Sequence, residues 1–195
     1  MAKLYFRYGA MNSGKSTALM QVAYNYEERG MRVLIMKPSI DTKGGEKLMS
    51  RLGVERRVDI AVRPDMDPLA LVRADIAKNG PLACVLTDES QFFTSWQAEQ
   101  LFMVTVALNV PVICYGLRAD FKGDLFPGSE ALLVMADKIE EVKTICWCGK
   151  KALCNARFDE SGHVIKEGEQ VVLGANDKYI GLCRKHWKEG NLGPQ

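Results

Sequence analysis

The loop Gly9-Ala10-Met11-Asn12-Ser13-Gly14-Lys15-Ser16-Thr17 fits the pattern G-x-x-x-x-G-K-[ST]. Residues 4–8 before it are rich in aromatic and aliphatic side chains and predict a strand. Residues 17–29 after it predict a helix that Gly30 closes. A strand, a glycine-rich loop and a helix in this order are typical of a phosphate-binding loop in an α/β protein.

The residue types in this loop indicate a nucleoside triphosphate site that includes all nine of its residues. Backbone N–H groups of the loop and of the helix N-terminus would point at the phosphates. Lys15 would reach the β- and γ-phosphates, and the Ser16 hydroxyl would bind Mg²⁺. The alternative is a glycine-rich turn that merely begins a core helix, but such a turn has no need for Lys followed by Ser.

The composition is that of an ordinary globular protein with no strong charge. The 195 residues are 47% hydrophobic and 26% charged, with a net charge of +2. This length predicts one domain with a small appendage, and the weak charge argues against a large nucleic-acid surface. The N-terminus leads directly into a strand, and no apolar run is long enough for a membrane span. We therefore expect a cytoplasmic protein whose six cysteines are metal ligands or buried thiols.

The first two-thirds of the chain alternate between strand and helix patterns, which predicts a parallel central sheet covered on both faces. Further strands are expected at 32–38, 57–62, 82–87, 111–116 and 138–145. Helices are expected at 68–78, at 95–107 with Ser95 as its cap, and at 129–136, and a polar loop at 41–51. Cysteine and glycine dominate after about Thr144, so we divide the chain into domains 1–143 and 144–195.

An acidic pair follows the apolar run at 82–87. Asp88 and Glu89 come directly after this predicted strand, and ligands of open α/β sheets bind at the carboxyl ends of strands. Asp88 could hold Mg²⁺, and Glu89 could accept a proton from an attacking hydroxyl or water. Solvated acids at a strand end are the alternative, which the upstream phosphate loop makes less attractive.

Three phenylalanines lie in loops at the same edge of the predicted sheet. Phe92 follows the acidic pair, and Phe121 and Phe126 follow the next strand. Together these rings could sandwich a planar base, which suggests a flat aromatic acceptor. Core packing under the loops is the alternative for any one of them.

The C-terminal region contains two short pairs of soft metal ligands, Cys146 with Cys148 and Cys183 with His186. Thiolate and imidazole ligands in a two-plus-two pattern favour tetrahedral Zn²⁺, with Cys154 as an alternative ligand. Four protein ligands leave no open position, so this zinc would be structural. It would clip the base of the polar, glycine-rich excursion at 155–179, which could close over an acceptor.

Taken together, these motifs resemble the type II thymidine kinases, a zinc-containing, RecA-like family. The resemblance spans essentially the whole chain, and the order of the motifs makes it specific. It is carried by the phosphate loop, by Thr87-Asp88-Glu89-Ser90-Gln91-Phe92-Phe93, by Tyr115-Gly116-Leu117-Arg118-Ala119-Asp120-Phe121 with Phe126-Pro127-Gly128-Ser129, and by Gly174-Ala175-Asn176-Asp177-Lys178-Tyr179 with Cys183-Arg184-Lys185-His186. The first cysteine pair is C-x-C where many members have C-x-x-C.

The resemblance implies a RecA-like P-loop domain with a parallel central sheet and a small C-terminal zinc-binding lasso domain. Glu89 would be the general base for the thymidine 5′-hydroxyl, and Asp88 would support Mg²⁺. ATP would be the donor, thymidine (with deoxyuridine) the acceptor, and dTTP a feedback inhibitor of a homotetramer. The base pocket would contain Met11, Phe92, Phe121 and Phe126, with Val172 on the base and Tyr179 on the sugar, and zinc would be held by Cys146, Cys148, Cys183 and His186.

Two other readings account for part of the sequence. A zinc-ribbon, RecA-like DNA-dependent ATPase would explain the phosphate loop, the acidic pair and the cysteines, but it predicts a basic patch. A nucleotide-binding regulator without turnover would have no use for Glu89 beside an aromatic pocket. Asp41 and Lys43 could touch phosphates or a neighbouring subunit, and the sequence does not choose between these roles.

Overall fold

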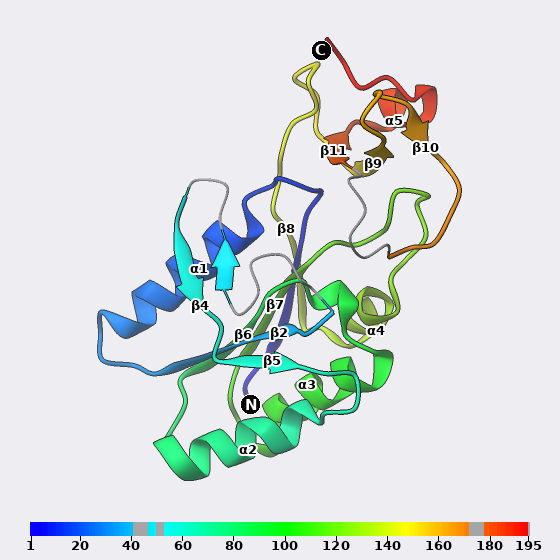
Figure 1. Cartoon of the computed structure of the whole chain (residues 1–195). Helices are drawn as coiled ribbons and strands as arrows, with labels where there is room; N and C mark the ends of the chain where they lie inside the picture. The colour runs from blue at the N-terminus through cyan, green and yellow to red at the C-terminus, as the bar shows by residue number, and fades with distance from the viewer. Residues whose placement is uncertain (41–46, 50–52, 172–177, 195) are drawn as a thin grey trace.

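The computed structural model describes residues 1–40, 47–49, 53–171 and 178–194. At its centre is a parallel six-stranded sheet in the order β5-β2-β6-β7-β1-β8 (Figure 1). Its strands are β1 Leu4–Tyr8, β2 Val33–Pro38, β5 Ile60–Val62, β6 Cys84–Thr87, β7 Val112–Gly116 and β8 Lys138–Glu141. The predicted α/β class with a parallel central sheet is therefore confirmed.

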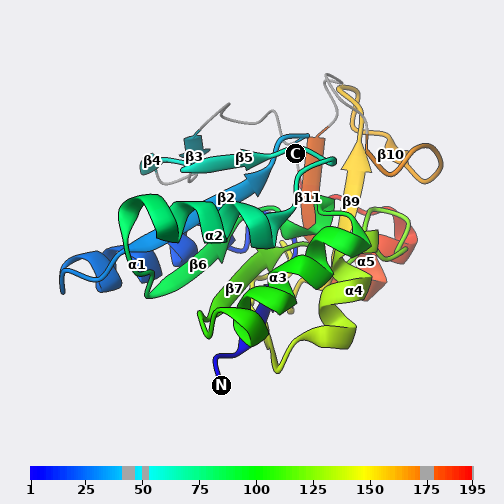
Figure 2. The same cartoon turned by 90° about the horizontal axis from the view of Figure 1, so that it is seen from below.

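Helices cover both faces of this sheet. The helix α1 Lys15–Glu27 lies on one face, and α2 Pro68–Asn79, α3 Ser95–Ala107 and α4 Pro127–Met135 lie on the other (Figure 2). Within the described ranges, no helix has the length and apolar character needed to cross a membrane.

Alternate strand residues supply the two apolar cores. In β2, Leu34 and Met36 pack with the α2–α3–α4 layer, whereas Val33 and Ile35 pack against α1. The same alternation runs through β6 and β7, because successive side chains of a strand point to opposite faces. Burial on both faces explains why these strands read as continuous apolar runs in the sequence.

The prediction of one strand at 57–62 is wrong, because this segment belongs to two different strands. Glu55–Arg57 is β4, which pairs antiparallel with β3 Lys47–Met49, and β5 begins only at Ile60, parallel to β2. Between them, Asp59 accepts a hydrogen bond from the Ile35 N–H at 2.7 Å and donates its own N–H to the Ile35 carbonyl. The chain thus changes sheets at Asp59. Part of the loop expected at 41–51 is the strand β3. Residues 41–46, which include Asp41 and Lys43, lie outside the described residues.

Several helix and strand ends also differ from the sequence-based bounds. The helix α1 begins at Lys15 after Gly14, which has a φ of +83° and ends the loop without a side-chain cap. The helix α4 begins at Pro127, whose fixed φ suits the first helical position. The strand β8 ends at Glu141, earlier than expected, because Val142 is the last residue whose N–H bonds to β1.

The cap of α3 is Thr94 and not Ser95 as expected. The Thr94 hydroxyl accepts the Gln97 N–H at 3.1 Å, and the Gln97 side chain accepts the Thr94 N–H at 3.2 Å. This reciprocal pair is a capping box, which satisfies two backbone donors at once. The Ser95 hydroxyl instead reaches the Pro127 carbonyl at 3.4 Å.

A small C-terminal unit lies beside the phosphate loop (Figure 1). Its sheet has the order β10-β9-β11, from β9 Cys154–Phe158, β10 Val164–Ile165 and β11 Lys178–Leu182, and the helix α5 Arg184–Glu189 follows. The excursion at 155–179 is therefore not a simple loop, since it contains most of β9, β10 and the start of β11. Division of the chain at 143/144 stays a prediction.

The capping box yields a matched pair of substitutions. We expect Thr94→Ala to lower the free energy of unfolding by about 1 kcal/mol, because it removes the hydroxyl that accepts the Gln97 N–H. Ser95→Ala should change it by less than about 0.5 kcal/mol, because Ser95 caps nothing. Urea unfolding of both variants tests this, and an equal loss in the two would contradict the assignment of Thr94 as the cap.

Candidate active site

The phosphate loop runs from the end of β1 to the start of α1 in a tightly turned conformation. Asn12 and Gly14 both have positive φ, +65° and +83°. A Cβ on Gly9 would lie 2.4 Å from Ser13 Oγ and 2.5 Å from the Val142 carbonyl, so only glycine fits there. Thr17 follows in the first turn of α1. The backbone thus forms the cradle that the sequence pattern predicts.

Lys15 is folded back onto this loop. Its Nζ donates to the carbonyls of Gly9, at 3.2 Å, and Ala10, at 3.0 Å. Burial lowers the pKa of Lys15, and the nearby carboxylates of Glu89 and Asp88 oppose that shift. The ammonium group therefore lies inside the loop, within reach of any phosphate bound there.

Asp88 joins the phosphate loop to the end of β6. The Ser16 hydroxyl donates to Asp88 Oδ2 at 2.8 Å, while Asp88 Oδ1 is buried without a hydrogen-bond partner among the described residues. Burial, and then the neighbouring charge of Glu89, raise the pKa of Asp88 to about 7. A buried carboxylate oxygen with no donor beside a serine hydroxyl fits the oxygen ligands that Mg²⁺ requires. Ser16 and Asp88 are thus suited to hold this ion.

Glu89 lies next to Asp88 on a strained turn. Its φ of 48° and ψ of 40° are left-handed values, which cost a residue with a side chain about 1–3 kcal/mol. Gln91 donates to Glu89 Oε2 at 2.6 Å and accepts the Leu117 N–H at 2.9 Å, so it fixes the carboxylate against the end of β7. The turn can come this close because residue 116 is glycine; a Cβ there would lie 2.8 Å from Gln91 Oε1. The Glu89 carboxylate is thereby oriented at the same sheet edge as Lys15 and Asp88.

The structure brings two of the three predicted aromatic residues together. The rings of Phe92 and Phe126 meet edge to face with centroids 5.6 Å apart. The ring of Phe121 lies under the Arg157 guanidinium, 5.2 Å from it. Phe121 and Phe126 are buried and Phe92 is half-buried, and the suggestion that the three rings sandwich a planar base stays a prediction.

The remaining predicted acceptor residues come from three segments. Met11 lies in the phosphate loop, and its N–H donates to Asn155 Oδ1 at 2.8 Å. Tyr179 is in β11, paired with Arg157 of β9. Val172 lies outside the described residues. Their contacts with a nucleoside stay predictions.

Cys146, Cys148, Cys183 and His186 converge on one point, with all four ligand atoms within 4.8 Å of one another. The Cys148 and Cys183 sulfurs are 3.9 Å apart, and His186 Nδ1 is 3.4 Å from Cys146 Sγ and 3.5 Å from Cys183 Sγ. A zinc tetrahedron with usual bond lengths has S–S edges of about 3.8 Å and S–N edges of about 3.5 Å. The donor set and its spacing therefore fit a structural Zn²⁺.

The surroundings of the cluster separate its cysteines from Cys154. Burial opposes ionisation of Cys146, but hydrogen bonds from the Cys148 and Cys183 backbone outweigh it and lower the pKa of Cys146 to about 6. Burial raises the pKa of Cys154, which lies outside the four-residue cluster and lines a groove with Arg118 and Arg184. Cys154 is thus not placed as a zinc ligand.

Sequence reasoning missed the roles of several polar side chains. Gln91 was read only as part of a motif, although it orients Glu89. Asn155 bridges the Met11 N–H and the Ala119 carbonyl, which its Nδ2 reaches at 3.0 Å. Asn155 was read as the start of a polar excursion; its burial, which makes the amide need partners, is a property of the fold. Asp120 and Gln170, which bond to each other at 3.1 Å, left no local pattern.

The family model and three similar relatives agree on one protein family. Residues 2–187 match the sequence model of the family described as "Thymidine kinase". A thymidine kinase of Ruegeria pomeroyi is 50% identical over 195 residues, 100% of this chain and 98% of that protein. Those of Rhodopirellula baltica and Coxiella burnetii are 52% and 49% identical over 97% of this chain, covering 89% and 97% of their own lengths. Among solved structures, a replication initiator DnaA bound to AMPPCP and single-stranded DNA has a TM-score of 0.42 at 16% identity, over 73% of this chain and 40% of that one, which supports no conclusion.

The metal cluster predicts which cysteine matters for zinc content. We expect about one zinc per chain in the purified protein, and a loss of most of it in Cys148→Ser, because a hydroxyl is a far poorer zinc ligand than a thiolate. Cys154→Ser should keep the full zinc content, since Cys154 lies outside the cluster. Elemental analysis of both variants tests this, and zinc loss in Cys154→Ser would contradict the assigned ligands.

Proposed function

This chain belongs to the thymidine kinase family, and from that premise we propose how its residues transfer a phosphoryl group from ATP to the 5′-hydroxyl of thymidine. The observation that carries the proposal is the shared position of four groups at one sheet edge. Lys15 and Ser16 come from the loop after β1, and Asp88 and Glu89 follow β6, with Ser16 bonded to Asp88. Phosphoryl transfer requires little of a protein beyond positioning and electrostatic stabilisation.

The donor side of the site is the phosphate loop. N–H groups of the phosphate loop and of the N-terminus of α1 receive the phosphates of ATP, and Lys15 exchanges its bonds to the Gly9 and Ala10 carbonyls for bonds to phosphate oxygens. Ser16 and Asp88 hold the magnesium ion, with the unpartnered Oδ1 of Asp88 as the free ligand atom. When bound, Mg²⁺ supplies positive charge that stabilises the transferred phosphoryl group.

On the acceptor side, Glu89 is the general base. The thymidine 5′-oxygen forms a bond to the γ-phosphorus, the bond from that phosphorus to the bridging oxygen of ADP breaks, and the hydroxyl proton passes to Glu89. Gln91 keeps the carboxylate in place through its bond at 2.6 Å. A base held in position contributes about 10²–10⁴-fold to such a step.

The acceptor base lies among Met11, Phe92, Phe121 and Phe126, with Val172 and Tyr179 contributing from the C-terminal unit. This assignment is supported by the nearness of the Phe92–Phe126 pair to the Glu89 turn, since Phe92 is three residues from Glu89. Aromatic rings that meet edge to face leave a ring face free for a further planar group. The same pocket admits deoxyuridine, which lacks only the 5-methyl group.

The C-terminal cysteine and histidine cluster and the assembly of the chain complete the proposal. The cluster of Cys146, Cys148, Cys183 and His186 holds a structural zinc that cross-links the base of the C-terminal unit. We further propose a cytoplasmic homotetramer that is inhibited by dTTP and acts in nucleotide salvage. Its nucleotide-binding domain is 1–143 and its zinc-binding domain 144–195.

The alternative of a DNA-dependent ATPase is disfavoured. Family membership across residues 2–187 and a net charge of only +2 both count against it. A DNA-stimulated enzyme would need a continuous basic surface to contact the phosphates of the strand.

The proposal is tested by ADP release from Mg-ATP with each candidate acceptor. We expect thymidine to stimulate release with matching formation of dTMP, and deoxyuridine to do so less, because the aromatic pocket receives a pyrimidine base. Single-stranded DNA is the parallel arm. Stimulation by DNA and not by thymidine would refute the kinase proposal.

Glu89→Gln tests the assignment of the base. We expect kcat to fall by about 10²–10⁴-fold while ATP binding is kept, because an amide cannot accept the hydroxyl proton. Glu99→Gln, the same change at an exposed position on α3, should leave kcat unchanged. Steady-state kinetics and ATP titration provide the measurement, and near-normal turnover in Glu89→Gln would exclude Glu89 as the base.

A further inference from the structure

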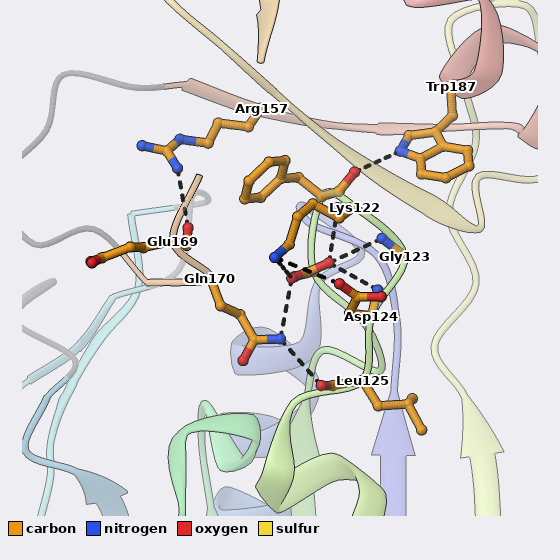
Figure 3. Close-up of polar contacts among 10 residues, drawn as sticks. Lys122, Gly123, Asp124, Leu125, Arg157, Glu169, Gln170 and Trp187 are labelled. Carbon is orange, nitrogen blue, oxygen red and sulfur yellow. Dashed lines mark hydrogen bonds and ion pairs between the residues drawn. The ribbon is translucent and has the colours of Figure 1, made fainter. Parts of the chain in front are cut away.

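The turn that carries Phe121 is organised around one buried carboxylate. Asp120 Oδ1 accepts the N–H groups of Lys122, Gly123 and Asp124 at 2.8–3.0 Å (Figure 3). The Asp120 N–H bonds in turn to the Asp124 carbonyl at 2.9 Å, which closes the turn. One oxygen of Asp120 therefore shapes the backbone of this turn, and its other oxygen, Oδ2, is left for contacts outside it.

Gln170 of the C-terminal unit uses that second oxygen. Its single amide nitrogen donates to Asp120 Oδ2 and to the Leu125 carbonyl, both at 3.1 Å (Figure 3). These two acceptors lie at the beginning and the end of the turn, where Ala119 and Leu125 form a β-bridge. The Lys122 ammonium is 4.0 Å from the same Oδ2, so Gln170 provides the shorter contact. The Gln170 amide thus spans the whole turn from outside.

Neighbouring side chains of the C-terminal unit hold the same turn at further points. Trp187 Nε1 donates to the Phe121 carbonyl at 3.0 Å (Figure 3). Asn155 Nδ2 donates to the Ala119 carbonyl at 3.0 Å. Arg157 lies over the Phe121 ring and donates to the Glu169 carbonyl at 3.4 Å, next to Gln170. The position of the Phe121 turn is therefore set from the C-terminal unit and not by the turn alone.

We propose that Asp120 and Gln170 are a pair of positioning residues that hold the turn from Arg118 to Phe126, and with it the rings of Phe121 and Phe126, in the conformation that receives the acceptor base. This inference rests on the proposed function, because it takes these two rings as part of the acceptor pocket. Asp120 and Gln170 are positioning residues and not catalytic residues in this proposal. They act through the backbone between Ala119 and Leu125.

The contacts of position 170 use the amide NH₂ group. It donates two hydrogens, one to a carboxylate and one to a carbonyl. A carboxylate at position 170 would place its oxygens against the Asp120 carboxylate and the Leu125 carbonyl, and both contacts would become repulsive. An amide at position 120 would keep an oxygen for the three backbone N–H groups but would turn its NH₂ toward that of Gln170. The hydrogen bond between Asp120 and Gln170 can therefore be broken by substitution, while the three backbone N–H bonds to residue 120 that shape the turn are kept.

Steady-state kinetics of four variants of the full chain test the pair. We expect Gln170→Ala to raise KM for thymidine by about tenfold, the scale of a lost hydrogen bond to a charged group, and Gln170→Glu to raise it further. Asp120→Asn should raise it as well. In the double variant Asp120→Asn/Gln170→Glu, the new amide at position 120 can donate to the new carboxylate, so part of the loss should be recovered. KM for ATP should stay within about twofold throughout, because the phosphate loop is untouched.

Asp124→Asn is the matched control, the same change in the same turn. Its side chain is 68% exposed and, among the described residues, forms an ion pair with Lys122 at 3.6 Å, so thymidine KM should equal that of the parent protein. The Tm of every variant is measured alongside. A parallel rise in both KM values with a lower Tm would show a merely structural role and overturn the proposal.

Phe92→Ala separates this inference from the proposed function. If Phe92→Ala raises thymidine KM and the Gln170 variants do not, the aromatic pocket stands and the positioning role of the pair is refuted. If none of these variants changes thymidine KM, the acceptor pocket itself is wrong and the inference falls with it. A rise in thymidine KM in both sets, with recovery in the double variant, supports the pair as positioning residues.

Discussion

The hydrogen bond between Ser16 and Asp88 is the contact on which the candidate site depends. It joins the loop after β1 to the end of β6, two strands that are separated in the sheet by β7. Because all six strands are parallel, their carboxyl ends share one edge, and loops distant in sequence meet there. Lys15 joins the same edge through its bonds to the phosphate loop, and Gln91 links Glu89 to the turn after β7 there. Apolar side chains that alternate along the strands pack against the helices on each face, and this packing holds the strands that end at this edge.

The C-terminal unit is a second support for that edge. Asn155 links the phosphate loop to the turn after β7, and Gly181 of β11 allows close approach, since a Cβ there would lie 3.2 Å from the Met11 carbonyl. Trp187 and Gln170 hold the same turn. The four ligands around the metal position lie at the base of this unit, between its first turn and α5. A metal there would stabilise the unit that contacts the turn after β7, while Lys15, Asp88 and Glu89 lie at the edge of the main sheet.

Much of this arrangement could be predicted from local patterns. Residue type and short spacing define the phosphate loop, the acidic pair Asp88 and Glu89, and the two Cys/His pairs. The structure places the members of each group together. Local preference failed where a long-range partner decided the outcome. The chain changes sheets at Asp59 because Ile35 of β2, 24 residues away in the sequence, bonds through its backbone to that residue. That contact leaves no trace in a window of a few residues. The cap at Thr94 is a different case, because T-x-x-Q at residues 94–97 is the local pattern of a capping box and was overlooked.

The motifs alone specified an α/β chain with a nucleotide site, a paired carboxylate and a metal cluster, because backbone cradles and metal ligands demand particular residues at fixed intervals. The three-dimensional arrangement decided which polar side chains support them. Gln91, Asp120, Asn155 and Gln170 are ordinary polar residues in the sequence, and they acquire a role only through partners up to 144 residues away. A buried amide or carboxylate must find donors or acceptors wherever the fold brings them, so its partner is a property of the packed molecule.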